Sequence, residues 1–339
     1  TWSIGVANGT AVDDLLMSGP ITGSSAITKT GAGRMLVSST STHTGTFTLS
    51  AGELAVTGSL ASGLTISSGA TLSGTGTVQG TVTHNGIVSP GIDGIAVLNL
   101  GALTQSSGSS TRITLNGINP GSGHDQLAVT GSATLSGTLQ IFLSPDYIPE
   151  VGNVFDVVTC AARTGTFSTI SLPTLPSDRA WTTTYNGGPT AGLRLTVEAV
   201  APPTYTLTYT AGANGSISGS TPQTIVQGAN GTTVTAVPNT GYHFVSWSDG
   251  VLTAARTATN VQANLSVTAS FAINQYTVTY TAGANGSISG TTPQTINHGS
   301  NASTVTAVPN TGYHFVSWSD GVLTAARTAT NIQTNLNVT

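Results

Sequence analysis

Short runs of alternating apolar and polar residues dominate the first half of the chain. Each run offers two or three apolar residues to one face, and glycine, asparagine or serine separates it from the next. The clearest runs cover residues 35–37, 47–49, 53–56, 64–66, 98–100, 112–115, 127–129 and 139–142. Strands this short cannot bury a face alone, but strands stacked in successive coils form one continuous core. The pattern therefore predicts a right-handed parallel β-helix, because a sandwich would have longer strands joined by tight hairpins.

The start of the chain has a pattern of its own. Trp2, Ile4 and Val6 alternate with polar or small residues, which predicts a strand with one apolar face. This strand is expected to be free, outside the coils that follow. Residues 12–17 are the one segment of the chain whose sequence suggests a single helical turn.

The second half of the chain is one sequence written twice. Residues 205–268 and 276–339 align at an offset of 71 residues, and ten of the 64 aligned positions differ. The differences cluster at 226–232 and the matching 297–303, which predicts an exposed loop. Each copy carries several strand-like runs separated by turn residues, so the repeat predicts a small all-β module used as a building unit.

Domain boundaries follow from these patterns. We predict a β-helical domain at residues 1–200, a proline-containing linker at 201–204, and modules at 205–274 and 275–339. Trp181 and Tyr185 can cover the last coil, since a solenoid needs a cap over its open core. Within the first module, Asn214-Gly215 is typical of a β-hairpin turn.

The second module is expected to be incomplete at its C-terminus. Its sequence stops at Thr339, which is equivalent to Thr268 of the first module. In the first module the last strand continues past Thr268 and places Phe271 and Ile273 on the same apolar face. Without their counterparts, the second module should have an unfilled groove and open strand edges, which invite another chain.

This groove suggests a contact between copies of the chain. Leu336 and Val338 lie on the last strand of the second module, and Trp2, Ile4 and Val6 form the free strand that could dock there. Such head-to-tail contacts generate open filaments. The alternative is that the natural chain continues past Thr339 with more repeats.

Several phrases of the first half resemble the autotransporter-associated β-strand repeat. They are the K-x-G-x-G-x-M-L-V run, the T-G-T-F and G-E-L-A-V runs, the G-I-V-S-P-G turn and the D-Q-L-A-V-T-G-S-A-T-L segment, at residues 27–37, 44–47, 50–56, 86–91 and 125–135. The resemblance covers about residues 20–200 and implies a β-helical passenger displayed outside a bacterial cell. One departure is that no outer-membrane barrel follows.

The two modules resemble the divergent InlB-type B-repeat of bacterial surface proteins. The phrase that carries the resemblance is G-Y-H-F-V-S-W-S-D-G, at residues 241–250 and again at 312–321. The resemblance covers residues 204–339 and implies an extracellular spacer or adhesive stalk. It implies no catalytic residues.

Composition narrows the classes of partner. Charged residues make up 6 % of the chain and Lys29 is its only lysine, so no basic patch exists to neutralise the phosphates of a nucleic acid. The sequence contains no run of about 20 apolar residues, so no segment is predicted to insert into a membrane. The formal net charge is −4 and 38 % of residues are hydrophobic, which indicates a chain that folds around a core.

Scarcity of charge also argues against an enzyme. A β-helical polysaccharide lyase or hydrolase would need clustered acidic or basic residues on one face, and the twelve carboxylates are scattered. Asp93, Asp125, Asp146 and Asp156 sit singly in turn-like sequences, where they cap turns. We therefore expect no catalytic residues, no cofactor and no metal site.

Histidine and cysteine offer few alternatives. His43, His84 and His124 lie in corners rich in serine, threonine and glycine, which predicts surface positions. Cys160 is alone, in a strand-like run, and is predicted to be a buried packing residue. Threonine-rich runs resemble ice-binding faces, but their spacing is irregular and threonine is a good strand former.

The aromatic phrase of each module allows two interpretations. Strict strand alternation places His243 and Trp247 on one face, and the second module repeats this with His314 and Trp318. These four residues could form a stacking platform for a host or neighbouring-cell glycan, which would make the protein a carbohydrate-binding module. The other interpretation is that each tryptophan fills the core of a module too small to spare it.

Together these patterns predict an all-β protein consisting of a parallel β-helix followed by two tandem modules. The function they favour is structural: a secreted or cell-surface bacterial protein that serves as an adhesin stalk or as a subunit of a fibre. The alternatives are the carbohydrate-binding module and, further off, a polysaccharide lyase or an ice-binding protein. The sequence names neither the organism nor a receptor.

Overall fold

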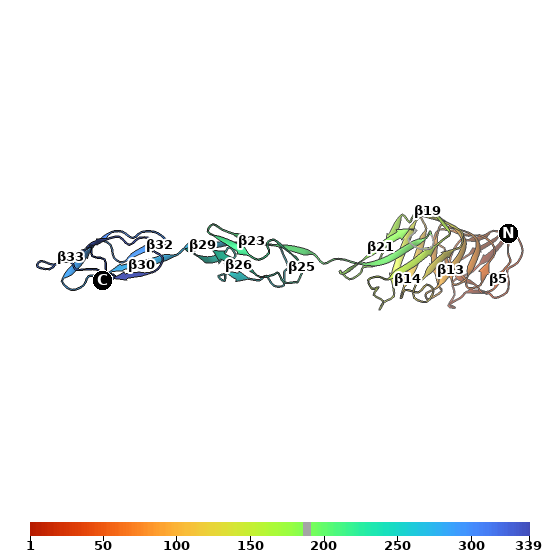
Figure 1. Ribbon diagram of the computed structural model, residues 1–339. Coiled ribbons are helices and arrows are strands. Elements are labelled where there is room, and N and C mark those ends of the chain that lie inside the picture. Colours follow the sequence, from red (N-terminus) through yellow and green to blue (C-terminus); the bar gives the residue numbers. More distant parts are fainter. Residues whose placement is uncertain (186–190) are drawn as a thin grey trace. The chain divides into compact units, whose positions relative to one another are not determined.

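The computed structural model describes residues 1–185 and 191–339, and over these residues every regular element is a β-strand. The chain divides into two compact units, Thr1–Ala201 and Pro202–Thr339, which can be followed by colour in Figure 1. The predicted all-β class is confirmed.

Two parallel sheets build the first unit, and the chain passes between them as it coils (Figure 1). Over the described residues the longer sheet runs in spatial order through β1 (Trp2–Gly5), β3 (Ile27–Thr30), β6 (Phe47–Leu49), β9 (Leu64–Ile66), β11 (Thr77–His84), β13 (Val97–Gln105), β15 (Gln126–Val129), β18 (Val154–Thr159), β22 (Leu193–Ala199) and β21 (Arg179–Tyr185). Shorter strands pair beside this path: β5 (Thr40–Ser41), β8 (Ser59–Leu60), β16 (Ser132–Leu135) and β19 (Ala162–Gly165). The other sheet runs through β2 (Leu15–Met17), β4 (Arg34–Val37), β7 (Glu53–Val56), β10 (Thr71–Gly74), β12 (Ile87–Pro90), β14 (Ser110–Leu115), β17 (Thr138–Leu143) and β20 (Thr169–Ser171). This arrangement is the predicted parallel β-helix.

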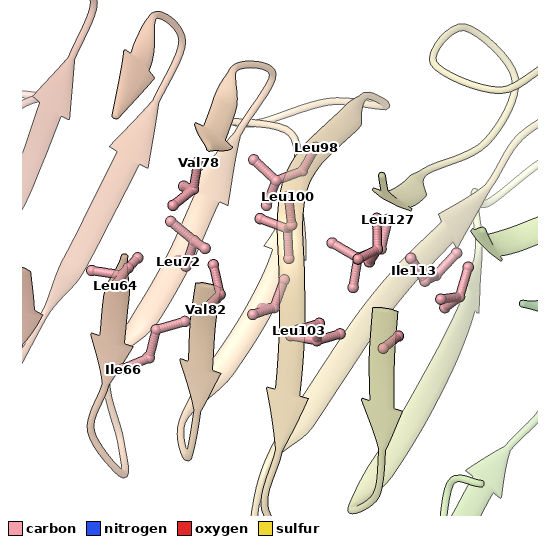
Figure 2. Packing of buried hydrophobic residues seen from close by; sticks show 14 of the residues in the cluster. Leu64, Ile66, Leu72, Val78, Val82, Leu98, Leu100, Leu103, Ile113 and Leu127 are labelled. Atoms are coloured by element: carbon pink, nitrogen blue, oxygen red, sulfur yellow. The ribbon is translucent and has the colours of Figure 1, made fainter. Parts of the chain in front are cut away.

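Inward side chains of neighbouring coils are register partners, so the core consists of rows of apolar residues. One row contains Ile27, Phe47, Leu64, Val82, Leu103 and Ala133. A row on the other sheet contains Met35, Leu54, Leu72 and Val88. Figure 2 shows such side chains filling the space between the strands. Burial of each large apolar side chain contributes about 1.5–3 kcal/mol, so coils of three-residue strands hold together by stacking.

Strand β2 lies where the sequence predicted a helical turn, so that prediction is wrong. Leu15–Met17 pairs in parallel with residues 35–37 of β4. Leu15 and Met17 pack against the core, while Leu16 between them is 55 % exposed. The alternation is that of a strand, because pairing with the next coil determines the backbone where local sequence allows either form.

The last coil is closed by antiparallel strands, as a cap requires. Strand β22 pairs antiparallel with both β18 and β21. Trp181 of β21 packs edge-on against Phe155, with 5.9 Å between ring centroids, and its indole N–H donates to the carbonyl of Pro173. The hydroxyl of Tyr185 accepts the N–H of Phe167 at 3.0 Å. The predicted covering role of both aromatic residues is confirmed.

The second unit contains two modules with matching strands. The first module consists of β23 (Thr204–Ala211), β24 (Gly215–Ser218), β25 (Gln223–Val226), β26 (Val234–Pro238), β27 (Tyr242–Trp247), β28 (Ala255–Arg256) and β29 (Leu265–Ile273). The second consists of β30 (Gln275–Tyr280), β31 (Gly286–Ser289), β32 (Gln294–Asn297), β33 (Val305–Pro309), β34 (Ala326–Arg327) and β35 (Leu336–Val338). Each module has one sheet around β23 or β30 and another around β26 or β33. The segments 226–230 and 299–301 are exposed, which agrees with the predicted variable loop.

The hairpin predicted at Asn214-Gly215 is absent from the described structure of the first module. Asn214 does turn the chain, with φ at 69°. Strands β23 and β24 on its two sides nevertheless belong to different sheets, and β24 pairs antiparallel with β26. Strand β29 pairs with residues 207–211 of β23, and on the side of β25 the hydroxyl of Thr221 accepts the N–H of Tyr209 and donates to its carbonyl, so the end of β23 has partners other than β24.

Candidate functional site

One inward row of the β-helix carries polar side chains among apolar ones. Its members, from coil to coil, are Ile4, Lys29, Leu49, Ile66, His84 and Gln105. All of them are buried except Ile4, which is half-buried. Each buried polar group must find a partner inside the protein, because leaving it unpaired costs about 1–3 kcal/mol. The buried polar side chains make this row a candidate site.

The ammonium of Lys29 makes its hydrogen bonds to backbone carbonyls. Its ammonium donates to the carbonyl oxygens of Gly31, Gly33 and Ala51, at 2.8 Å for the first and the last. The residue is 0 % exposed, and burial lowers the pKa of its amine while Asp14 and Glu53 act in the opposite direction. All three donor positions of the ammonium are used, so Lys29 joins consecutive coils and presents nothing to a substrate.

The three histidines predicted at the surface are buried, so that prediction is wrong. His43, His84 and His124 are each at most 1 % exposed. His43 Nε2 lies 2.7 Å from the Ser25 carbonyl, and His84 Nε2 lies 3.1 Å from that of Ser110. His124 Nδ1 likewise lies 3.3 Å from the Gly117 carbonyl, so each buried imidazole has a backbone carbonyl within hydrogen-bond distance.

Burial makes His84 a source of acid sensitivity. Its Nδ1 is buried without a hydrogen-bond partner, and desolvation lowers the pKa of His84 from 6.5 to about 4. As pH falls, the His84 imidazole of the unfolded chain therefore takes up its proton before that of the folded protein. The free energy of unfolding decreases for this reason between pH 6.5 and about 4. Asp125 acts oppositely, since burial raises its pKa to about 6 and the folded state gains stability as pH falls below that value.

We expect His84→Leu to flatten the pH dependence of stability. Leucine suits this row, which already holds Leu49 and Ile66 at the same position. Between pH 7 and pH 4.5 the variant should lose about 2–3 kcal/mol less unfolding free energy than the parent chain. Urea unfolding of both proteins at the two pH values measures the difference, and parallel losses would contradict the assignment to His84.

The structure gathers charges that the sequence scatters. Arg34 on β4 stands beside its register partner Glu53 on β7, with 2.9 Å between Nε and Oε2. Asp93 and Asp13 lie 3.5 and 3.9 Å from Nη1 of the same guanidinium. Sequence inspection missed this cluster because its members come from four coils. Arg34 and Glu53 hold the same position in their strands, and this was the one signal in the sequence that could have shown the cluster.

This cluster around Arg34 has the connections of a structural clamp. Glu53 also accepts the hydroxyl of Ser73 from the next coil. Asp14 accepts the backbone N–H groups of Gly9 and Arg34, which hold the pKa of its carboxyl below the usual value. A glycosidase pair needs one carboxyl kept protonated and open to substrate. Near Arg34 every named carboxylate instead faces a cation or a backbone donor.

Asp125 and Cys160 complete the buried titratable groups of the first unit's core. Asp125 is 2 % exposed and accepts the N–H groups of Ala96 and Thr114, both at 2.8 Å. Cys160 is 1 % exposed within the hydrophobic cluster, and burial raises the pKa of its thiol. The prediction that Cys160 is a packing residue is confirmed, and Asp125 ties neighbouring segments as a buried cap.

Residues 1–185 and 191–339 contain neither a cluster of metal-ligating side chains nor a membrane-spanning helix. No group of three or more His, Cys, Asp or Glu side chains there could hold a metal ion. In the same residues no helix has the length and hydropathy needed to cross a membrane.

Trp247 and Trp318 lie inside their modules. They are 1 % and 2 % exposed, whereas His243 and His314 are exposed. The four side chains therefore form no common face, and the tryptophans present no surface to a glycan in this structure. The residues predicted as a stacking platform are divided between core and surface.

A β-bulge explains why strict alternation misplaced Trp247. The pairing of β27 with β29 shifts between Phe244 and Ser246, so Val245 has no partner residue. One extra residue moves Trp247 to the inward side together with Phe244, and their rings lie 6.0 Å apart. Sequence alone gives no sign of the bulge, because it depends on the opposite strand.

Each buried tryptophan is held by an arginine. Arg256 makes two hydrogen bonds to Asp249, at 2.9 and 2.8 Å, and its guanidinium lies 5.1 Å from the Trp247 ring centroid. The indole N–H of Trp247 donates to the carbonyl of Thr253. The second module repeats this clasp with Arg327, Asp320, Trp318 and Thr324. The charged residues of the modules thus serve packing.

The predicted contact residues at the start of the chain lie in the β-helix. Strand β1 pairs in parallel with β3, so this segment is not the free strand that the sequence predicted. Val6 is 4 % exposed, Ile4 is half-buried and Trp2 is 69 % exposed. Ile4 packs against the core and Val6 is part of it, while Trp2 shares their face, pairs with the inward Ile27 and is left exposed.

The predicted contact residues at the other end lie on β35. Val338 is 2 % exposed and Leu336 is half-buried, and both pair with β30. They are core residues of the second module, so a partner would meet the open edge of β35 and not these side chains.

Comparison with known families agrees with the modules. A model of the divergent InlB B-repeat domain matches residues 205–275 and again residues 276–339. Residues 205–339 are two B-repeat domains. Domains of this family occur in bacterial surface proteins, and the family is not one of enzymes. No curated protein matches the chain. The autotransporter-like character of residues 20–200 stays a prediction.

Proposed function

We propose that the protein is a structural component of a bacterial cell surface, in which the β-helix and the two B-repeat domains act as a stalk. The observation that carries this proposal is the use of polar groups: Lys29, His84 and the clasps of Arg256 and Arg327 all serve internal packing. A tandem of nearly identical modules adds length or repeated contact, which suits a spacer better than a single-cleft enzyme.

Localisation in the source bacterium tests the surface role. Antibodies against residues 205–339 should label intact cells, and mild protease treatment of intact cells should remove the label. A chain recovered only from the cytosol, with intact cells unlabelled, would contradict the proposal.

Self-association into fibres is the second part of the proposal. Strand β1 is the first strand of its sheet, and its outer edge together with Trp2 could add to a strand of a neighbouring copy. Negative-stain microscopy of the purified protein should then show filaments with a regular repeat. Trp2→Ser should abolish them without changing the melting temperature, because Trp2 is 69 % exposed. Filaments that persist in this variant would exclude β1 as the contact.

A further inference from the structure

One outward row of the β-helix consists of threonines, and we call it the threonine row. Its members are register partners on successive coils, from β3 to β19: Thr28, Thr48, Thr65, Thr83, Thr104, Thr134 and Thr164. Along the chain their spacing is irregular, with 17 residues from Thr48 to Thr65 and 30 from Thr104 to Thr134. Loops of different length absorb these differences, so the row is regular in space although the sequence spacing is not.

The rows on both sides of the threonine row are small and uncharged. Backbone hydrogen bonds between coils continue beyond the threonines, for example from Ser67 to Leu49 and from Asn85 to Ile66. Residues two positions away share the face of each threonine. They are exposed or half-buried, and they comprise Ala26, Thr46, Gly63, Thr81, Ala102, Ser132 and Ala162 before the row and Thr30, Ser50, Ser67, Asn85 and Ser106 after it. Side chains of similar height without a charge make this face flat and neutral.

The other sheet of the β-helix shows that this uniformity is not general. Its outward register pairs include large and charged side chains: Leu16 with Leu36, Arg34 with Glu53, Arg112 with Gln140, and Thr114 with Phe142. Threonine is a good strand former, but that preference acts on both sheets alike. Strand stability therefore does not explain why threonine is concentrated in one row.

The hydroxyls in the middle of the threonine row are open to solvent. Thr65, Thr83 and Thr104 are exposed, and within the described residues their hydroxyls make no hydrogen bond to the protein. At the end of the row the Oγ1 atoms of Thr134 and Thr164 lie 3.0 Å apart. Because threonine is stiff at χ1, each hydroxyl and each methyl is held in a fixed place.

A partner that matches this face must be flat, uncharged and periodic. Neighbouring strands lie about 4.8 Å apart, so a hydroxyl and a methyl recur at that repeat. A charged polymer would find no counter-charge on the face. Six steps of about 4.8 Å and two of about 6.7 Å give an area of roughly 400 Å², and a stable protein contact needs about 800 Å² per partner.

Ice meets all of these requirements. Water oxygens in its surface planes repeat at nearly the spacing of the strands. Methyl groups restrict the orientation of first-shell water, and hydroxyls hold such water by hydrogen bonds. A rigid row that carries both groups at one repeat therefore orders water in the pattern of the lattice, and little entropy is lost when ice meets a face already in place.

We propose that the threonine row and its two flanking rows are an ice-binding face. The methyls and hydroxyls order a layer of water, and this layer joins the protein to the ice lattice. The face lies wholly within the first unit, so the B-repeat domains take no part in it. The inference rests on the register of the coils and does not depend on the proposed surface role.

Uptake into growing ice tests the face in the 339-residue protein. Ice grown slowly from a dilute, stirred solution takes up proteins that bind its surface and excludes others. The parent chain should be enriched in the ice at least about tenfold over serum albumin, because the threonines act together on one lattice. An equal content of both proteins in the ice would overturn the proposal.

Thr83→Tyr is the blocking variant. Its ring stands above the neighbouring threonines and separates the face from the ice, so uptake should fall at least about tenfold. Thr104→Tyr should give the same loss one coil further on, and it replaces Thr83→Tyr if that variant melts early. Uptake that persists in a folded variant would overturn the assignment to the threonine row.

Thr169→Tyr is the matched control. Thr169 is an exposed residue of β20 on the other sheet, so uptake of this variant should equal that of the parent. All three variants should keep the melting temperature of the parent, because tyrosine at an exposed strand position is a good strand former. An equal loss of uptake in Thr169→Tyr and Thr83→Tyr would also overturn the assignment.

A crystalline polysaccharide is another flat, uncharged and periodic surface. Sedimentation with insoluble cellulose and with chitin separates this class of partner from ice. The parent chain should remain in solution with both. If it sediments with either polymer, loses that binding in Thr83→Tyr and is excluded from ice, the threonine row binds a glycan and the ice-binding proposal is wrong.

Discussion

Trp247→Ala is expected to lower the free energy of unfolding of the first B-repeat domain by about 3–5 kcal/mol. Trp247 is 1 % exposed and contacts the rings of Tyr209 and Phe244, with centroids 5.8 and 6.0 Å away. Its removal leaves a cavity and also takes away the surface on which Arg256 rests. Hydrogen exchange resolved by peptide should show residues 205–275 exchanging about 100-fold faster or more.

Leu252 provides the control for this prediction. It is 75 % exposed in the same domain, so Leu252→Ala should change stability by less than about 0.5 kcal/mol. If Trp247→Ala were as mild as Leu252→Ala, Trp247 would not be a core residue, and an exposed stacking role would have to be considered again.

Lys29→Met is expected to destabilise the β-helix by about 2–3 kcal/mol. Methionine keeps most of the aliphatic length of the lysine side chain but has no atom in place of Nζ, so the carbonyls of Gly31, Gly33 and Ala51 lose their donor. The hydrogen bond to Gly33 is buried, and its unpaired carbonyl costs roughly 1–3 kcal/mol; the other two are part-buried and cost less, and relief of the buried charge offsets part of the total. Calorimetry should show the effect in the transition of the first unit, while the B-repeat domains remain unchanged.

Thr65→Ala serves as the control for Lys29→Met. Thr65 is an outward residue of β9, whose exposed hydroxyl is free to meet solvent, so its loss should change stability by less than about 0.5 kcal/mol. Equal stability of the Lys29→Met protein and the parent would show that water or backbone movement satisfies the three carbonyls.

Periodicity predicted the β-helix well because every coil repeats the same alternation of apolar and polar residues. Inward residues such as Leu64 and Val82 keep the same place in successive runs, and a single register aligns them. The same parity places Lys29 and His84 inward, as Ile27-Thr28-Lys29 and Val82-Thr83-His84 show. We predicted His84 at the surface from its residue type, and in this fold strand position outweighs residue type.

The repeat in the sequence determined the two modules. Two copies of 64 aligned residues with ten differences imply two equal folds, and the family match agrees. This inference needed only the comparison of the chain with itself.

Only the tertiary structure decided which way Trp247 faces, because the bulge at Val245 depends on the opposite strand. It also decided that 15–17 is a strand, that β24 joins β26, and that Arg34, Glu53 and Asp93 meet. Each of these facts rests on partners far apart in the chain. The sequence by itself determined the strand periodicity, the class of fold and the repeated unit, because these arise from local alternation and from self-similarity. Which edge each strand pairs with, and which polar side chain meets which carbonyl, follow from long-range packing that no local pattern records.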